Sequence, residues 1–286
     1  MKLGPLFVGA GYTGARVLAR LPETIALGRS QPGERRLDLD GDARLAITLP
    51  ADYDVIYSVP PSGEAPTDLR LERLLGQLAP APARFIYLST TGVYGNRDGA
   101  TVDETTEPRP ESDRAARRIS AEQQVAEWCA AHDSVPIILR IPGIYGPGRL
   151  GLDRIRDGMP VLTEEDASPG NRIHVDDLAT CCVAALSEDV PGGIYNVGDG
   201  DHRSSTWFTN EIARQASLPP PPTVSREEAE KTFSPMRLSF LRESRIVDTT
   251  KMRDLLDVTP VSYTHLRAHE TLTPISYAVF CLKKGG

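Results

Sequence analysis

A run of glycines near the beginning of the chain has the spacing that binds a dinucleotide. Residues 9–14 follow the pattern G-x-G-x-x-G, after the apolar stretch 6–8 and before the helix-like stretch 15–21. In this order the first glycine permits a tight turn, the second lets the backbone approach a pyrophosphate, and the third lets helix and strand pack closely. The start of the helix offers free N–H groups to the phosphates, whereas the competing interpretation is a purely structural glycine-rich turn. The predicted cofactor-binding residues of this loop are Gly9, Gly11, Tyr12, Thr13 and Gly14.

The residues after the second predicted strand, 24–27, bear on which dinucleotide binds. An acidic side chain there would accept hydrogen bonds from the ribose hydroxyls of NAD. This chain instead has Gly28, Arg29 and Ser30. Because a guanidinium can pair with a 2′-phosphate and stack on adenine, Arg29 and Ser30 favour NADP, with NAD as the alternative. An ordinary surface arginine is the competing explanation of Arg29.

The elements that would position these residues alternate along the chain. Strand-like apolar stretches recur between stretches of helical periodicity, which predicts an α/β fold: a doubly wound parallel sheet with right-handed crossovers and helices on both faces. Residues 142–148, rich in glycine and proline, are predicted to form a loop. The predicted strands are 6–8, 24–27, 36–39, 54–59, 84–89, 136–140 and 194–197, and the predicted helices are 68–78, 113–132 (capped by Ser112) and 178–186.

The regular alternation weakens in the second half of the chain, which predicts two parts of unequal size. We expect a dinucleotide-binding Rossmann domain of residues 1–145 plus 175–198. We expect a smaller, discontinuous substrate lobe of residues 146–174 plus 199–260. The pattern then stops, because residues 261–286 begin with a stretch that resembles translated sequencing-adapter read-through. We therefore expect this last segment to be a non-native tail.

Composition excludes several classes of protein. The 286 residues carry a net charge of −7, which argues against a nucleic-acid-binding surface. No apolar run approaches the roughly 18 residues of a membrane helix, so we expect no membrane partner. The chain enters its first strand directly, so no signal peptide is expected. Its four cysteines lack metal-type spacing, which predicts no metal site and a reducing, cytoplasmic compartment.

Four further runs resemble the motifs of one family. They are 85–95 (FIYLSTTGVYG), 139–148 (LRIPGIYGPG), 172–179 (RIHVDDLA) and 194–198 (IYNVG). In order and spacing they resemble the extended short-chain dehydrogenase/reductase family, the NAD-dependent epimerases and dehydratases that act on nucleotide sugars. The resemblance implies a dinucleotide cofactor and a small-molecule substrate, and it is compatible with a homodimer.

The resemblance also implies roles for residues near the cofactor. Asp38 matches an acidic residue near the adenine amine, and Thr90 matches the hydroxyl that hydrogen-bonds the substrate oxygen. Pro60, in place of a more usual alanine-rich turn, would stiffen the wall near the adenosine ribose. Turn capping would explain Asp38, and local backbone hydrogen bonding would explain Thr90, without any ligand.

The chain departs from this family at the catalytic pair. A Tyr-x-x-x-Lys pair opens the helix after the 85–95 motif in the family, and here Arg114 and Arg118 stand at those positions. A guanidinium stays protonated and accepts no hydrogen bond, so Arg114 cannot act as a general base. Arg118 can still donate hydrogen bonds to the nicotinamide-ribose hydroxyls. The chain therefore resembles an atypical subgroup of the family that lacks the catalytic tyrosine.

Three interpretations of the arginine pair remain open. Arg114 and Arg118 can form a solvated helix face, with Arg118 and Glu122 as an i,i+4 pair. They can instead clamp an anionic substrate group beside the cofactor. In the third interpretation they assist a catalytic acid located elsewhere, for which Tyr94 and Tyr145 are the candidates.

A histidine and two aspartates suggest a hydrolytic triad, but a structural explanation is favoured. His174, Asp176 and Asp177 are close in sequence, yet the chain has no G-x-S-x-G nucleophile motif. We therefore expect Asp176 or Asp177 to cap the helix 178–186, and His174 to pack at the boundary of the lobe.

These residues support two functions. The first is an atypical NAD(P)-dependent oxidoreductase or epimerase-like enzyme, with Thr90, Arg114 and Arg118 at the reaction site and a small polar metabolite, such as a nucleotide sugar, as substrate. The second is a non-catalytic NADP(H)-binding sensor or regulatory protein, because the usual proton donor is absent.

Overall fold

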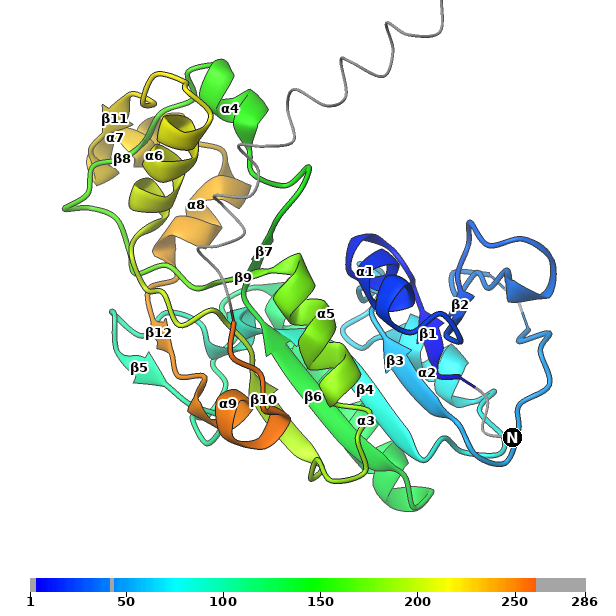
Figure 1. Cartoon of the computed structure of the whole chain (residues 1–286). Coiled ribbons are helices and arrows are strands. Elements are labelled where there is room, and N and C mark those ends of the chain that lie inside the picture. Colours follow the sequence, from blue (N-terminus) through cyan, green and yellow to red (C-terminus); the bar gives the residue numbers. More distant parts are fainter. Residues whose placement is uncertain (1–3, 42–43, 261–286) are drawn as a thin grey trace, which may run out of the picture.

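A six-stranded sheet forms the centre of the fold, and its neighbouring strands are all parallel. The computed structural model describes residues 4–41 and 44–260, and Figure 1 shows the whole chain. Across the sheet the strands follow the order β10, β6, β4, β3, β1, β2, so the winding changes direction between β1 and β3. Ligands of such sheets bind outside the carboxyl ends of the strands at this switch point. The strands are β1 (Leu6–Val8), β2 (Ile25–Leu27), β3 (Asp54–Tyr57), β4 (Arg84–Thr90), β6 (Val135–Ile141) and β10 (Gly193–Asn196).

Helices cover both faces of this sheet (Figure 1). Consecutive strand residues point to opposite faces, and in β1 Phe7 packs in one apolar cluster whereas Leu6 and Val8 pack in another. Side chains of α1, α5 and α9 complete the first cluster, and side chains of α2 and α3 complete the second. This arrangement confirms the predicted doubly wound α/β fold. The helices are α1 (Tyr12–Arg20), α2 (Leu69–Leu75), α3 (Asp113–Ala131), α5 (Val175–Ala184) and α9 (Thr250–Leu256).

Polar side chains define where two of these helices begin. The Asp68 carboxylate accepts hydrogen bonds from the backbone N–H groups of Arg70 (3.1 Å) and Leu71 (3.2 Å) at the start of α2. At the start of α3, the Ser112 hydroxyl accepts a hydrogen bond from the Ala115 N–H at 3.3 Å, as predicted. These bonds satisfy N–H groups that have no partner within the helix.

The predicted third strand, 36–39, is wrong. Its pairing with the sheet consists of one parallel bridge to Gly28, and a short 3-10 helix, η1 (Gly33–Arg35), precedes it. The Asp38 carboxylate accepts a hydrogen bond from the Asp40 N–H at 3.1 Å. This local turn directs the backbone away from the sheet, since it competes with the hydrogen bonds of a strand.

The predicted cap of helix 178–186 is also wrong. Helix α5 begins at Val175, and the His174 ring caps it by accepting a hydrogen bond from the Asp176 N–H at 3.2 Å. Asp176 and Asp177 lie in the first turn, where negative charge favours the positive end of the helix dipole.

Part of the predicted loop 142–148 is a strand. Strand β7 (Gly143–Tyr145) pairs in parallel with β9 (Arg172–His174). The glycine and proline content of this stretch predicted a loop. The strand was missed because its pairing partner, β9, is distant in sequence. The pairing fixes Tyr145 opposite His174, next to the start of α5.

Smaller elements gather apart from the large sheet, at the upper left of Figure 1. The side chains of Tyr145, Ile155, Ile212 and Ala213 form their apolar core. The exact division into domain and lobe stays a prediction, and the predicted tail, 261–286, lies outside the described residues. Within the part of the chain that the structure describes, no helix has both the length and the apolar character needed to cross a membrane. The remaining elements are η2 (Thr91–Tyr94), β5 (Thr101–Val102), α4 (Leu152–Arg156), β8 (Val161–Leu162), α6 (Ser205–Gln215), β11 (Thr223–Val224), α7 (Arg226–Thr232), α8 (Pro235–Arg242) and β12 (Ile246–Val247).

Candidate cofactor and substrate site

The glycine loop after β1 has the geometry that its sequence predicts. Gly9 has a φ of +85°, and a Cβ there would lie 2.6 Å from Val59 Cγ2. A Cβ on Gly14 would lie 3.0 Å from both the Ala10 Cβ and the Phe7 Cε1, so this residue allows α1 to pack closely on β1. At Gly11 the nearest atom to such a Cβ is 3.9 Å away, and no side chain caps the start of α1. The loop therefore leaves open space in front of the first N–H groups of α1, as a phosphate-binding turn requires.

The loop opens on a cavity of about 350 Å³ at the switch point of the sheet, which we call the nucleotide cavity. The structure brings residues from five separate segments together there. Two charged residues that line this cavity, Asp40 and Arg70, were not predicted as site residues by the sequence analysis. The predicted cofactor-binding residues that line the cavity are Gly9, Gly11, Arg29, Ser30, Asp38 and Pro60.

Asp40 joins two arginines at the far end of the nucleotide cavity. Its carboxylate oxygens accept hydrogen bonds from Arg70 Nε at 2.5 Å and Arg70 Nη2 at 2.8 Å, and Arg29 Nη1 lies 3.5 Å away. Arg70 Nη1 also donates to the carbonyl oxygen of Pro60 at 2.8 Å. The hydrogen bond from Arg70 lowers the pKa of Asp40, and the Asp40 carboxylate in turn raises the pKa of Arg70. Arg70 is therefore neutralised, whereas the Arg29 side chain is 70% exposed and its contact with Asp40 is long, at 3.5 Å.

A second cavity, of about 410 Å³, continues from the first and is called here the middle cavity. Gly9, Gly11 and Pro60 line both cavities, and Tyr12 and Thr13 line the middle cavity. At its other end the middle cavity is lined by residues from the carboxyl end of β4 and from α3, including Thr90 and Arg118. A path lined by one continuous set of residues thus leads from the glycine loop to the predicted reaction site.

The third cavity in this series has a volume of about 600 Å³ and contains the predicted reaction residues, so we call it the reaction cavity. Thr90, Arg114 and Arg118 all line it. Arg118 Nη1 donates to the Tyr87 hydroxyl at 3.0 Å and to the Leu88 carbonyl oxygen at 3.1 Å. These bonds hold the half-buried Arg118 against β4, so its guanidinium is not part of a solvated helix face.

The expected i,i+4 partner of Arg118 is engaged elsewhere. Glu122 is buried and pairs with Arg140 at 2.7 Å, and it also accepts a hydrogen bond from the Ser89 hydroxyl. The solvated-face interpretation is therefore wrong for Arg118. The solvated-face interpretation still holds in part for Arg114, because this residue is exposed. Its guanidinium nevertheless lies 4.5 Å from the centre of the Phe240 ring.

The two candidate tyrosines occupy different environments. Tyr94 is fully buried, donates a hydrogen bond to Asn196 Oδ1 at 2.7 Å, and does not line the reaction cavity. Tyr145 does line the reaction cavity, where its ring packs edge-on against His174 at 5.2 Å. Tyr145 is also hydrogen-bonded to Asp199, and burial raises the pKa of this aspartate to about 7.

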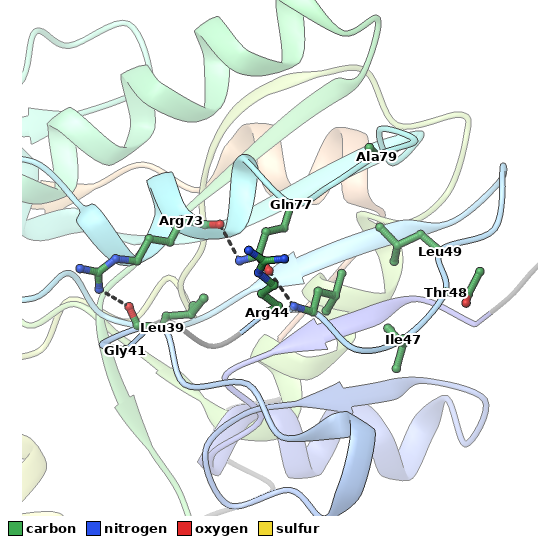
Figure 2. Close-up of a pocket in the computed structure, with 10 residues that line it drawn as sticks. Leu39, Gly41, Arg44, Ile47, Thr48, Leu49, Arg73, Gln77 and Ala79 are labelled. Carbon is green, nitrogen blue, oxygen red and sulfur yellow. Dashed lines mark hydrogen bonds between the residues drawn. The ribbon is translucent and has the colours of Figure 1, made fainter.

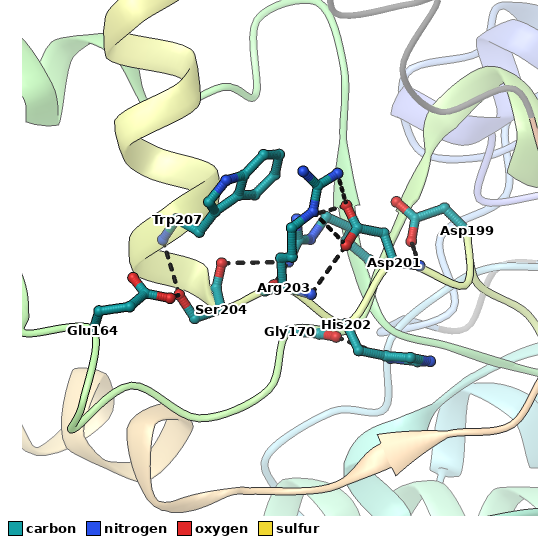
Figure 3. Close-up of polar contacts among 9 residues, drawn as sticks. Glu164, Gly170, Asp199, Asp201, His202, Arg203, Ser204 and Trp207 are labelled. Carbon is teal, nitrogen blue, oxygen red and sulfur yellow. Dashed lines mark hydrogen bonds and ion pairs between the residues drawn. The ribbon is translucent and has the colours of Figure 1, made fainter.

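A polar network lies next to Gly170 and Arg172, which line the reaction cavity (Figure 3). Arg203 stacks over the Trp207 ring at 3.5 Å and pairs with Asp201 at 3.0 Å. The Ser204 hydroxyl donates to Glu164 at 2.5 Å and accepts from the Trp207 N–H at 2.9 Å, which starts α6. The buried Arg172 side chain, from β9, donates to the carbonyl oxygen of Arg203, so the network ties β9 to the segment just before α6.

The reaction cavity is strongly cationic. Its lining contains five arginines and one acidic residue, Glu243. Glu243 pairs with Arg245 at 2.7 Å, and Asp201, outside the lining, pairs with Arg172 at 3.7 Å, so the excess of positive charge comes from Arg114, Arg118 and Arg149. The sequence analysis missed three of the five arginines, because they come from segments remote from the family's catalytic positions. The five are Arg114, Arg118, Arg149, Arg172 and Arg245.

Arg149 lies at the junction of the middle and reaction cavities, since it lines both. Its guanidinium stacks over the Tyr12 ring at 4.0 Å, and the Tyr12 hydroxyl donates to the Pro147 carbonyl oxygen at 3.0 Å. The predicted cofactor residue Tyr12 therefore connects α1 to the segment that carries Arg149.

A further cavity lies elsewhere and is not assigned to the site. This groove of about 900 Å³ separates the segment 44–49 from α2, as Figure 2 shows. Arg73 and Gln77, which could offer polar groups, hold the chain instead: Arg73 Nη1 donates to the Leu39 carbonyl oxygen at 2.6 Å, and Gln77 Oε1 accepts from the Leu45 N–H at 2.6 Å. Within the described ranges no group of histidines, cysteines and acids could hold a metal ion.

The fold and the glycine loop are typical of dinucleotide-binding α/β proteins, and comparison with known proteins shows what the chain is similar to. Residues 67–198 match the sequence model of the NAD dependent epimerase/dehydratase family. The chain is similar to this family over that range, as its motifs predict.

Individual known proteins are also similar to this chain. Protein YeeZ of Escherichia coli (strain K12) is 32% identical over 185 residues, which cover 64% of this chain and 62% of YeeZ. A functionally unknown conserved protein from Silicibacter pomeroyi DSS has a similar structure, with a TM-score of 0.74 and 29% identity over 93% of this chain and 98% of that one. MoeE5 in complex with UDP-glucuronic acid and NAD has a TM-score of 0.74 and 21% identity, over 97% of this chain and 99% of MoeE5, and therefore shows the same fold.

Proposed function

We propose that the protein is an NADP(H)-dependent oxidoreductase of the epimerase/dehydratase type that acts on a small anionic metabolite. The continuity of the three cavities carries this proposal. The middle cavity is lined by Gly9 and Gly11 at one end and by Thr90 and Arg118 at the other, so a dinucleotide on the glycine loop would reach the reaction cavity. The excess of arginines in that cavity favours a substrate with a carboxylate or phosphate group.

The cofactor preference follows from the nucleotide cavity. Because Asp40 already neutralises Arg70, Arg29 is the cation left to pair with a 2′-phosphate. The hydroxyl of Ser30 lines the same cavity and adds a hydrogen-bonding group. We therefore propose NADP(H) as the preferred cofactor and NAD(H) as the weaker one.

The residues of the reaction cavity divide the work of binding and orientation. Arg118 is held by β4 through Nη1, which leaves further N–H groups to donate to the ribose next to the nicotinamide. Arg114 binds the anionic group of the substrate, and Thr90 orients the reacting oxygen. When bound, the cofactor supplies or accepts the hydride.

The proton needs a different carrier, since neither arginine can exchange one at ordinary pH. We assign this role to Tyr145, the candidate tyrosine that lines the reaction cavity. In the reducing direction its hydroxyl gives a proton to the substrate oxygen as hydride reaches the carbon. Asp199, hydrogen-bonded to Tyr145, then restores that proton from solvent.

The second candidate function is that of an NADP(H)-binding sensor. The observation in its favour is that a guanidinium, Arg114, stands where the family's catalytic phenol is expected. A cytoplasmic location is part of either proposal, and the free thiols of Cys129, Cys181 and Cys182, all buried, are compatible with a reducing compartment.

A binding and turnover experiment separates these functions. NADP(H) and NAD(H) are titrated by calorimetry into the full chain, and oxidation or reduction of the coenzyme is then followed with nucleotide sugars, keto acids and phosphorylated aldehydes. Coenzyme binding with turnover supports the enzyme, whereas tight NADP(H) binding without turnover of any substrate supports the sensor. Retention of neither coenzyme by folded protein would contradict both.

A further inference from the structure

A fourth cavity adjoins the reaction cavity on the side of the small elements, and we call it the lobe cavity. It has a volume of about 390 Å³ and is formed by α4, β8, α6 and α8, with the segment before α4. Arg149, Ser205, Phe208, Phe240 and Leu241 line both the lobe cavity and the reaction cavity. A molecule that reacts next to Thr90 can therefore extend into the lobe cavity.

The floor of the lobe cavity is apolar. Ile155, Leu162 and Ile212 are buried beneath it. Met159 (39% exposed) and Phe240 (52% exposed) also line it. Of the three large hydrophobic side chains exposed in the described part of the chain, these are two. Apolar surface that is unusual elsewhere on this protein thus gathers around one cavity, which is a feature of ligand sites.

The rim of the lobe cavity is positively charged. Arg149, Arg154 and Arg237 line it, and its lining includes no acidic residue. The Arg237 guanidinium stacks over the Phe233 ring at 3.5 Å and donates to the Pro160 carbonyl oxygen, so it is fixed at the rim. Burial and the charge of Arg154, which lines the same cavity, both lower the pKa of Arg237. An anion bound in the cavity would be attracted by both cations.

We propose that the lobe cavity binds the distal part of the substrate, and that this part is an apolar carbon skeleton with a carboxylate or phosphate group. The skeleton lies on the floor of Ile155 and Ile212, and Arg154 and Arg237 bind the anionic group. The reaction of this ligand rests on the proposed function, whereas its binding in the lobe cavity does not.

A nucleotide fits this cavity less well than an amphiphilic anion. The polar edge of a base needs hydrogen-bonding partners, and the polar side chains of the lining other than arginines are Ser205 and Thr209. The Thr209 hydroxyl already donates to the Ser205 carbonyl oxygen at 2.8 Å. Burying a base there would leave polar groups unpaired, which disfavours it against a hydrocarbon of similar size.

The test uses four probes titrated by calorimetry into the full chain: octyl phosphate, octyl glucoside, inorganic phosphate and UDP. Octyl phosphate combines both recognised features, octyl glucoside and inorganic phosphate each carry one, and UDP represents a nucleotide. We expect octyl phosphate to bind most tightly. Loss of a charged hydrogen bond weakens binding by about tenfold or more, so Arg154→Gln and Arg237→Gln should each weaken octyl phosphate by about that factor.

Arg156→Gln is the matched control, because Arg156 belongs to the same helix as Arg154 but pairs with Asp153 and does not line the cavity. Its affinity for octyl phosphate should equal that of the unmodified protein. Tighter binding of UDP than of octyl phosphate, or equal affinities in all variants, would overturn the proposal. If octyl phosphate behaves as expected but NADP(H) does not bind, the lobe cavity is confirmed and the proposed function is rejected.

Discussion

The two glycines that flank the start of α1 allow cofactor binding to be tested separately from folding. Gly11 and Gly14 belong to the same motif, yet the structure assigns them different tasks. A Cβ on Gly11 would have its nearest neighbour, the Gly9 carbonyl oxygen, at 3.9 Å, so there is room for a side chain, although the backbone angles of Gly11, φ −93° and ψ −135°, lie outside the main regions that residues with a Cβ adopt. A Cβ on Gly14 would lie 3.0 Å from Phe7 and from Ala10. Valine at position 11 should therefore act mainly on cofactor binding, and valine at position 14 mainly on the stability of the protein.

Gly11→Val should abolish binding of NADP(H) in a protein that remains folded. The added side chain occupies the space in front of the α1 N-terminus, where the pyrophosphate would accept hydrogen bonds from the backbone. Each hydrogen bond to a charged group contributes about 1.5–3 kcal/mol, so losing two costs about 3–6 kcal/mol, or at least about a hundredfold in Kd. The stability of the protein should fall by about 0.5–2 kcal/mol, since glycine is preferred over valine at a helix N-cap.

Gly14→Val should instead destabilise the protein. Overpacking of a close contact costs about 1–3 kcal/mol, because neither the Phe7 ring in β1 nor the backbone of α1 can move without disturbing the sheet.

The assay combines urea denaturation, followed by circular dichroism, with calorimetric titration of NADP(H) for both variants. An undiminished affinity in Gly11→Val would refute the assignment of the loop as the phosphate site. Equal losses of stability in the two variants would refute the division of tasks between the glycines.

Three further changes test the rest of the site. Arg29→Asp should move the ratio of the Kd values for NADP and NAD by at least about tenfold toward NAD, since it replaces the cation near Asp40 by an anion; calorimetry showing an unchanged ratio would count against the role of Arg29. Arg114→Ala should weaken an anionic substrate or inhibitor by about 1.5–3 kcal/mol, whereas Arg117→Ala, outside the reaction cavity, should not; equal affinities in both variants would leave Arg114 as a solvated residue. Asp199→Asn should flatten the pH dependence of stability. Burial raises the pKa of Asp199 from 3.8 to about 7, so the native state holds an extra proton between these pH values. In the unmodified protein the free energy of unfolding therefore falls as the pH rises through this range, by at most about 4 kcal/mol. Urea denaturation from pH 4 to pH 8 measures this slope, and an identical slope in Asp199→Asn would contradict the inference.

The sequence determined the class of fold and the cofactor loop, because both depend on local patterns. Apolar stretches of strand length alternate with helical periodicity, and the roles of Gly9 and Gly14 follow from a turn and a close packing contact within a short segment. Where local hydrogen bonding competes with the sheet, as in the turn at Asp38, the same pattern failed and the third strand was wrong.

The surroundings of the reaction site were decided by the tertiary structure. The partner of Glu122 is Arg140 on β6, not Arg118 on its own helix, because α3 packs its buried face against the sheet. Likewise Asp40 pairs with Arg70 near the switch point, and no spacing in the sequence predicts this ion pair.

The positive charge of the substrate site also has a tertiary origin. Arg149, Arg172 and Arg245 belong to three segments that converge only when β7 pairs with β9 and α6 docks beside them. A sequence motif predicts the role of residues whose interactions are made with neighbours along the chain. The charge of a cavity is instead the sum over all side chains that line it, and that sum is fixed by how the elements pack.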